Sequence, residues 1–279
     1  MFGLAYNSRA RNKSRECILI DETARISSKA VIGKNVSIGP WTIVGPDVVV
    51  GDGSEIGSHV VLKGPTVLGP NVKVFQFSTV GEGTPALAYD GESTSLEIGE
   101  GTVIREGVTI HRGTLGRGAG RTIVGKNCLL MAYVHIGHDC FLGDRVIMAN
   151  NASVAGHVVV GDYANFGGYS GVPQFRNIGE NTHIAAMSLV TKDVPAFMTV
   201  AGNPASAVGL NLEGMRRRDF STDALAALKE SHKIVYRSGL TKNKALNQLA
   251  ELRSKYSEVE KFARSIESSE SGIVRGRSH

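Results

Sequence analysis

Aliphatic residues recur at every sixth position through most of this chain of 279 residues. Counted from Ile20, the period holds without a miss to Val80, and the same phase returns between Ile98 and Ile110. After a second interruption it resumes in a shifted phase that runs from Val124 to Val190. A period of six fits neither an α-helix nor an isolated strand, so it must describe a higher-order coil.

Such a period is typical of the hexapeptide repeat of parallel β-helices, in which stacked coils bury the aliphatic residue of each hexad. The 34 glycines, which follow no collagen-like pattern, suit a backbone that turns often. Resemblance to hexapeptide-repeat proteins implies three sides per coil and a left-handed coil, so that residues 18 apart stack. We therefore predict a mainly β fold, a left-handed parallel β-helix with a C-terminal α-helical tail.

The two interruptions, near residues 82–97 and 112–122, predict loops that leave the coil, where binding groups often lie. From Ser221 onward the periodicity is helical, with Gly239 as a stop. Residues 244–256 predict a second helix, and Ser257 with Glu260 a capping box for a third. We expect three segments: a basic N-terminal extension (1–17), the β-helix domain (18–200) and a C-terminal helical domain (201–279), whose tail packs on the coil or on a neighbouring subunit.

The net charge of +5 is spread along the chain, and no nucleic-acid-binding motif accompanies it. No apolar run is long enough to predict a membrane span. The three cysteines, Cys17, Cys128 and Cys140, form no CxxC pair, which favours a reducing cytoplasm over a disulfide framework or a zinc knuckle. The basic segment 1–17 is either a transit-like sequence or a flexible extension.

The stretch "LLMAYVHIGHDC" places His135 and His138 three residues apart and sets Asp139 directly after them. Under the 18-residue rule, His138 lies below Gly156 and Asp139 below His157. Three interpretations remain open: a metal site, histidines exposed by accident on a polar side, and a general base. Histidine suits a base because its ordinary pKa of about 6.5 leaves it largely neutral at cellular pH. A stacked backbone amide would suit an oxyanion.

The stretches "IREGVTIHRGT", "NCLLMAYVHIGHDC", "MANNASVAGHVVV" and "GLNLEGMRRRDF" make the chain, from about residue 20 to 265, resemble the UDP-N-acetylglucosamine O-acyltransferases of lipid A biosynthesis. The resemblance implies that His138 is the general base for the sugar 3-hydroxyl, that Asp139 orients it, and that the Gly156 amide holds the oxyanion.

The resemblance also implies positions that bind substrate. Four would line the cleft: His111, His135, His157 and Gln174. Four more would lie near the acyl chain, pantetheine and phosphates: Asn211, Glu213, Arg217 and Arg218. The implied donor is an acyl chain on acyl carrier protein, an acidic partner that suits Arg216, Arg217 and Arg218, although such a triplet can also be a solvated turn. The family is a homotrimer with clefts between subunits, and it uses no metal or other cofactor in catalysis.

The chain departs from the family pattern in the first loop and beside Gln174. The segment "TPALAYDGE" has Pro85, Ala86 and Ala88 where Gln, Asp and Lys are expected, and Pro173 replaces a histidine. Ala186 stands where long-acyl members have glycine, which predicts a somewhat shorter acyl chain.

We expect a cytoplasmic enzyme that moves a 3-hydroxyacyl chain from acyl carrier protein to the 3-position of UDP-N-acetylglucosamine. One alternative is the same chemistry on another acceptor, such as a 3-amino UDP-sugar. Another is a paralogue that binds the carrier protein or the nucleotide sugar without catalysis. An N-acetyltransferase that uses coenzyme A fits less well, because the tail resembles that of the carrier-protein enzymes.

Overall fold

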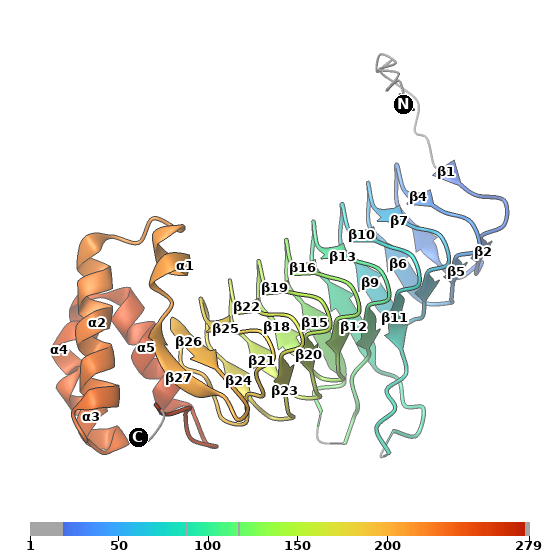
Figure 1. Cartoon of the computed structure of the whole chain (residues 1–279). Helices are drawn as coiled ribbons and strands as arrows, with labels where there is room; N and C mark the ends of the chain where they lie inside the picture. The colour runs from blue at the N-terminus through green and yellow to red at the C-terminus, as the bar shows by residue number, and fades with distance from the viewer. Residues whose placement is uncertain (1–18, 88, 117, 277–279) are drawn as a thin grey trace, which may run out of the picture.

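The computed structural model describes residues 19–87, 89–116 and 118–276, so the N-terminal extension, Cys17 and Ala88 lie outside the described residues. Very short strands stack into three sheets that form the sides of a long prism, with helices at its C-terminal end (Figure 1). The strands are parallel except for the last pair of the first sheet, which is antiparallel. Strands 18 residues apart pair in register along the uninterrupted coils, as in Ile38↔Ile56 and Ile136↔Val154. The structure confirms the predicted β-helix with a helical tail.

The first sheet has eleven strands: β1 (Leu19–Ile20), β4 (Ser37–Ile38), β7 (Glu55–Ile56), β10 (Lys73–Val74), β13 (Val103–Ile104), β16 (Leu129–Leu130), β19 (Ile147–Met148), β22 (Asn165–Phe166), β25 (His183–Ile184), β26 (Met198–Ala201) and β27 (Ser206–Leu210). The second has eight: β2 (Arg25–Ile26), β5 (Ile43–Val44), β8 (Val61–Leu62), β11 (Thr79–Glu82), β14 (Thr109–His111), β17 (His135–Ile136), β20 (Ser153–Val154) and β23 (Gly171–Val172). The third also has eight: β3 (Val31–Ile32), β6 (Val48–Val50), β9 (Thr66–Leu68), β12 (Ser95–Ile98), β15 (Arg121–Val124), β18 (Phe141–Leu142), β21 (Val159–Val160) and β24 (Asn177–Ile178).

The hexad residues form the core of the prism. From Ile38 to Val190 every one of them is buried, whereas Ile20 is 39% exposed because its coil lies at the open end of the stack. The corners need backbone with positive φ, and many non-glycine residues adopt it there, among them Asp139 (56°) and His157 (61°). Each corner thereby turns the chain sharply enough to start the next side.

The two interruptions are shorter than the hexad count suggests. β12 and β15 each begin before the residue at which the hexad count resumes, which is Ile98 in β12 and Val124 in β15. The two strands already pair there, at Ser95↔Arg121 and Leu96↔Thr122. The first excursion is therefore residues 83–94, and the second is residues 112–120.

The tail differs from the prediction in three places. α1 (Leu212–Arg216) was not expected, and the Asn211 side chain caps it by accepting from the Gly214 amide. α2 (Thr222–Arg237) begins after its Ser221 cap as predicted, but the second predicted helix is two, α3 (Lys242–Gln248) and α4 (Ala250–Lys255), which meet at the fully buried Leu249.

The predicted capping box of the third helix is wrong. Ser257 is the first residue of α5 (Ser257–Glu267), whose N-cap is Tyr256 and has no side-chain cap bond. Glu260 instead accepts from Arg253 Nε at 2.7 Å, which ties α4 to α5.

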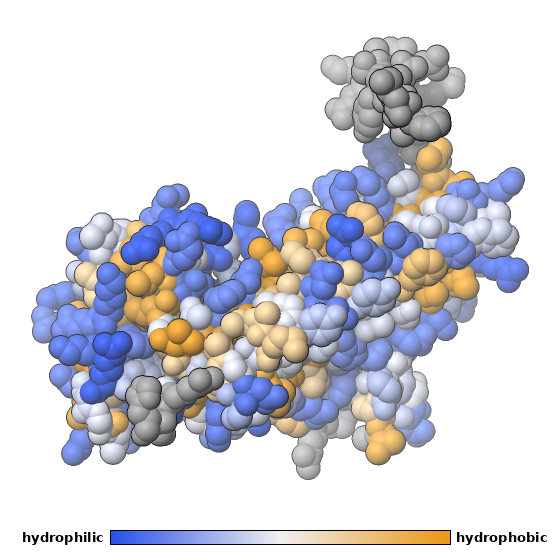
Figure 2. All heavy atoms as spheres, viewed as in Figure 1, coloured by the Kyte–Doolittle hydropathy of each residue, from blue (hydrophilic) through white to orange (hydrophobic). Residues whose placement is uncertain are grey.

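The helical tail packs on the last coils, one of the two places expected for it. Lys261 Nζ lies 2.9 Å from Glu180 Oε1, and Ser269 Oγ donates to Asp193 Oδ2 at 2.7 Å. Hydrophilic residues cover much of the helical end, while apolar patches gather along the coil (Figure 2). Within the described residues, no helix is both long and apolar enough to cross a bilayer.

Candidate active site

One corner of the prism collects the predicted base and both excursions. We call it the base corner: the turns from the second sheet to the third, which include residues 137–140, 155–158 and 173–176. The first excursion joins β11 to β12 and the second joins β14 to β15, so both leave the coil at this corner as well (Figure 1). The loops and the histidines are therefore neighbours because they interrupt the same edge of the fold.

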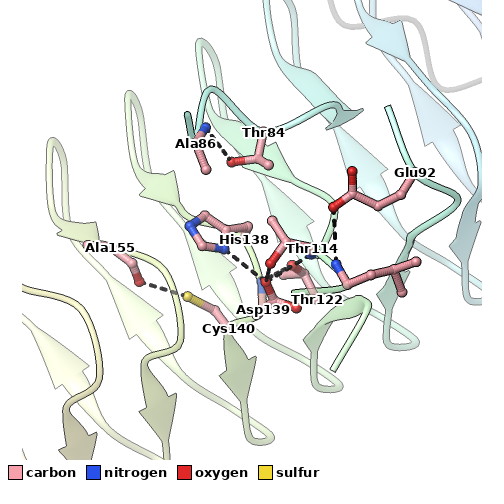
Figure 3. A network of polar contacts seen from close by, with 10 residues as sticks. Thr84, Ala86, Glu92, Thr114, Thr122, His138, Asp139, Cys140 and Ala155 are labelled. Carbon is pink, nitrogen blue, oxygen red and sulfur yellow. Dashed lines mark hydrogen bonds and ion pairs between the residues drawn. The ribbon is translucent and has the colours of Figure 1, made fainter. Parts of the chain in front are cut away.

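His138 and Asp139 form a buried hydrogen-bonded pair. His138 Nδ1 lies 2.8 Å from Asp139 Oδ2, and the two residues are 9% and 3% exposed (Figure 3). Because an ionised carboxylate only accepts, His138 carries its proton on Nδ1 and presents Nε2 as a proton acceptor. This is the arrangement that an oriented general base requires.

Gly156 lies directly against the accepting nitrogen. A Cβ built on Gly156 would stand 2.4 Å from His138 Nε2, which leaves room for glycine alone. Among the described residues, no backbone group accepts from the Gly156 amide. The stacking predicted from the 18-residue count is thus present, and the amide is available to an incoming oxygen.

The same corner stacks a ladder of rings above Asp139. The imidazoles of His138 and His157 meet edge to face with centroids 4.8 Å apart, and His157 stacks on Phe175 at 4.5 Å. Gln174, one coil above Gly156, is exposed at this corner. Towards the second sheet, the ring centroid of His135 lies 5.1 Å from that of His111, and Thr109 Oγ1 lies 2.8 Å from His135 Nδ1. The structure thus brings the four predicted cleft residues to the base corner or the adjoining edge of the second sheet.

Burial keeps the surrounding imidazoles neutral. It lowers the pKa of His111 to about 4, with a smaller contribution from His135 in the same direction. Burial likewise lowers the pKa of His135 and of His157. At neutral pH these rings are polar and uncharged, so they can serve as hydrogen-bond donors or acceptors to a substrate.

The residues that could hold a metal are His138, Asp139 and His157, whose ligand atoms lie within 4.8 Å of one another. Asp139 Oδ2, however, already accepts from three donors: His138 Nδ1, the Thr114 amide and Thr114 Oγ1. A metal on that oxygen would displace donors that now satisfy a buried charge. The arrangement fits a proton-transfer pair better than a metal centre.

The four residues predicted to lie near the acyl chain, pantetheine and phosphates are away from the base corner. They line a pocket of about 580 Å³ together with the outward residues of β19, β22 and β25, all in the first sheet. That pocket includes Asn211, Glu213, Arg217 and Arg218. In a three-sided coil the first sheet is the side opposite the corner between the second and third sheets, so one chain does not bring these four residues to His138.

The remaining predicted positions are exposed or half-buried. Ala186 lies in the turn after β25, at the edge of the second sheet away from the base corner. Pro85 is exposed in the first excursion, and Ala86 is half-buried with its amide donating to Thr84 Oγ1 at 3.2 Å. Pro173 precedes Gln174 at the base corner and is half-buried.

Two residues of the site escaped the sequence analysis. Phe175 could have been predicted by the same 18-residue count that placed His157, because it lies 18 residues further on. Thr114 could not have been predicted in this way, because it lies in the second excursion, where no period tells which coil a loop residue will contact.

Comparisons with known proteins agree with this geometry. Residues 193–274 match the family described as UDP N-acetylglucosamine O-acyltransferase, domain 2, and residues 29–64 and 121–156 match the bacterial transferase hexapeptide of six repeats. The acyl-[acyl-carrier-protein]–UDP-N-acetylglucosamine O-acyltransferase of Saccharophagus degradans is 49% identical over 256 residues, which cover 92% of this chain and 99% of that protein. The enzyme of the same name from Stutzerimonas stutzeri is 51% identical over 257 residues, with the same coverage.

Solved structures are similar as well. The Acinetobacter baumannii protein superposes with a TM-score of 0.90 at 46% identity, covering 92% of this chain and 100% of that one. The UDP-N-acetylglucosamine acyltransferase of Francisella novicida gives a TM-score of 0.91 at 35% identity, over 93% and 95% of the two chains. These likenesses confirm the family predicted from the motifs: the chain belongs to the UDP-N-acetylglucosamine O-acyltransferases.

Proposed function

We propose that this protein transfers a 3-hydroxyacyl chain from acyl carrier protein to the 3-hydroxyl of UDP-N-acetylglucosamine, the first step of lipid A biosynthesis. The observation that carries the proposal is the His138–Asp139 pair whose free Nε2 faces the Gly156 backbone. A protein that only binds its ligands needs neither an oriented base nor an amide beside it.

In the proposed reaction, His138 Nε2 takes the proton of the acceptor hydroxyl as the oxygen attacks the thioester carbon. The Gly156 amide donates to the developing oxyanion. Collapse of the tetrahedral intermediate breaks the carbon–sulfur bond, and the imidazolium returns its proton to the leaving thiolate. Asp139 stabilises the transient imidazolium without itself taking a proton. The step needs no metal or organic cofactor, because His138 and Gly156 supply the base and the oxyanion donor.

The outward face of the second sheet suits an acyl chain. Beyond His135 its outward residues are Ser153 and Gly171, both small, followed by Leu189, which is 36% exposed. This strip runs from the base corner towards Ala186. We propose that the acyl chain lies along it and that Ala186 limits its length.

We propose that a second subunit completes the site, in a homotrimer. The support is that the pocket containing Asn211, Glu213, Arg217 and Arg218 lies on the side opposite His138. A ridge of exposed apolar residues follows the corner between the first and second sheets: Trp41 (61%), Phe77 (66%), Tyr133 (64%), Tyr169 (64%) and Met187 (70%). Exposed apolar surface of this kind supports a subunit interface along that corner.

The proposed donor is acyl carrier protein, and Arg216 and Arg217 would meet its acidic surface because both are exposed on or beside α1. We also propose a cytoplasmic location, supported by the two buried free thiols of Cys128 and Cys140. The proposed division into a coil domain (18–200) and a helical domain (201–279) is supported by the succession of helices that follows residue 211.

A second candidate acceptor is a 3-amino UDP-sugar. It is favoured by the apolar side chains of Pro85, Ala86 and Pro173, where the family pattern has polar ones. Each lost charged contact could weaken binding of the ordinary sugar by about 1.5 to 3 kcal/mol.

The deciding experiment incubates purified protein with 3-hydroxyacyl carrier protein and either UDP-N-acetylglucosamine or its 3-amino analogue, and identifies products by mass spectrometry. Acylation of the ordinary sugar is the expected result. Acylation of the amino analogue alone would mean that the acceptor is a 3-amino UDP-sugar. No product from either sugar would favour a protein that binds its ligands without catalysis.

A further inference from the structure

The second excursion contacts Asp139 through Thr114. Thr114 is 7% exposed, its amide donates to Asp139 Oδ2 at 2.9 Å, and its Oγ1 donates to the same oxygen at 2.8 Å (Figure 3). That oxygen also accepts from His138 Nδ1 at 2.8 Å. One carboxylate oxygen therefore joins the excursion to the candidate base.

The other oxygen of the carboxylate, Oδ1, lies under the same excursion. Asp139 Oδ1 is buried and, within the described residues, has no hydrogen-bond partner. Glycines of the second excursion surround it: a Cβ at Gly118 would lie 2.3 Å from Oδ1, and one at Gly113 would lie 2.7 Å from it. The excursion thus covers the carboxylate on one side, and among the residues that the structure describes only Oδ2 is hydrogen-bonded.

The backbone of Asp139 is held as well. Its amide donates to the fully buried Thr122 Oγ1 at 2.8 Å, at the start of the coil that follows the excursion. With the backbone fixed, the remaining freedom of the side chain is rotation of the carboxylate. The two donors on Thr114 oppose that rotation, because turning Oδ2 away would leave them and a buried charge unpaired.

The excursion is itself tied to the first one. Glu92 Oε1 accepts from the amide of Leu115, the residue after Thr114, at 3.1 Å, and Glu92 Oε2 accepts from the Asp90 amide at 2.8 Å. Hydrogen bonds from its own backbone amide, and then from those of Asp90 and Leu115, hold the pKa of Glu92 below its ordinary value, so this link is charged at neutral pH. The position of Thr114 is consequently fixed from two sides.

We propose that Thr114 is a positioning residue for acyl transfer, acting through Asp139 to hold His138 in the orientation that accepts the acceptor's proton. The inference rests on the proposed function, which names His138 as the base. It gives the second excursion a role in aligning the base, beside any contact that the loop makes with substrate.

The test compares Thr114→Val, which keeps the shape and loses the hydroxyl, with Thr114→Ser, which keeps the hydroxyl. We expect Thr114→Val to lower kcat by about tenfold to a hundredfold, the effect of losing one hydrogen bond to a buried charge, with KM for both substrates nearly unchanged. Thr114→Ser should retain most of the rate. Wild-type kcat in Thr114→Val, or an equal loss in Thr114→Ser, would overturn the proposal.

A matched control is Thr102→Val. Thr102 is buried like Thr114 and also donates through its hydroxyl, to Gly125 O at 2.8 Å, but it lies at the corner between the third and first sheets. The same loss of kcat in this variant would mean that a general loosening of the coil explains the effect. Thermal unfolding of each variant shows whether the coil is intact.

A second readout does not depend on activity. Imidazole nitrogen shifts of selectively labelled His138, assigned with His138→Gln, report whether the proton rests on Nδ1. We expect the Nδ1–H form in the wild type and a mixed tautomer in Thr114→Val. If the wild type fails to acylate any acceptor but shows this change, the proposed function is wrong and the positioning role stands. Unchanged shifts in Thr114→Val would contradict the positioning role itself.

Discussion

Gly156 lies one coil above His138, and its Cα faces the imidazole so closely that a methyl group there would come within 2.4 Å of Nε2. The contact joins the proposed proton acceptor to the proposed oxyanion donor at successive positions of one corner. The acceptor oxygen that gives its proton to Nε2 is thereby close to the amide that stabilises the negative charge developing on the thioester oxygen.

Gly156→Ala should therefore remove activity without unfolding the coil. The added Cβ displaces the imidazole and disturbs the amide beside it, and loss of an oxyanion donor alone typically lowers kcat by about 10² to 10³. Gly209→Ala, in β27 and away from both the base corner and the proposed acyl groove, is the control, because a Cβ there meets nothing within 4 Å. Steady-state kinetics on both variants decide the matter, and near-normal turnover in Gly156→Ala would contradict the assignment.

His138→Ala should lower kcat by about 10² to 10⁴, the contribution usual for a general base. The measurement is product formation with saturating acyl carrier protein and acceptor. His232→Ala, in α2 and outside the base corner, is the control and should keep its rate. Turnover of His138→Ala close to that of wild type would mean that another group takes the proton.

The fold and the centre of the site could be predicted because one simple count governs both. The hexads fix which residue faces inward, and the 18-residue stacking places Gly156 on His138 and His157 on Asp139. Coil geometry is repetitive, so sequence separation translates directly into spatial position.

The rest depends on contacts that no period describes. Thr114 meets Asp139 across 25 residues because an irregular loop folds back over the corner. The second tail helix breaks at Leu249, although the apolar pattern runs on, and Glu260 bonds to Arg253 and does not complete a capping box. For Glu260 a contact between helices overrides a local signal, whereas for Thr114 the sequence carries no local signal at all.

The separation of His138 from Arg217 and Arg218 predicts that inactive subunits complement one another. In the proposed trimer, co-expression of His138→Ala chains with Arg217→Ala/Arg218→Ala chains should yield mixed assemblies in which some sites pair an intact base with an intact basic pocket. Specific activity should then exceed that of either variant alone. Mixed assemblies no more active than the two parents would show that the basic pocket does not act on a neighbour's base.

Acid should destabilise the fold in part through His111. Its pKa of about 4 in the folded chain lies below the ordinary 6.5. Between pH 6.5 and about 4, the unfolded chain therefore binds a proton at His111 that the folded chain does not bind. The free energy of unfolding therefore falls as pH drops from 6.5 to about 4, and this contribution is constant below that. Urea unfolding at pH 5 and pH 7 should show a smaller loss in His111→Gln than in the wild type, and equal losses would contradict the burial argument.

Ala186 should set the preferred acyl length. The proposed groove starts at the base corner, passes the small residues Ser153 and Gly171, and reaches the turn that holds Ala186 at the other edge of the second sheet. Removing that methyl lengthens the groove, so Ala186→Gly should shift the preference towards a longer acyl chain. A panel of carrier proteins loaded with different chain lengths measures the shift in kcat/KM, with Ala185→Gly as the control for losing a methyl in the same turn. An unchanged profile in Ala186→Gly would place the end of the groove elsewhere.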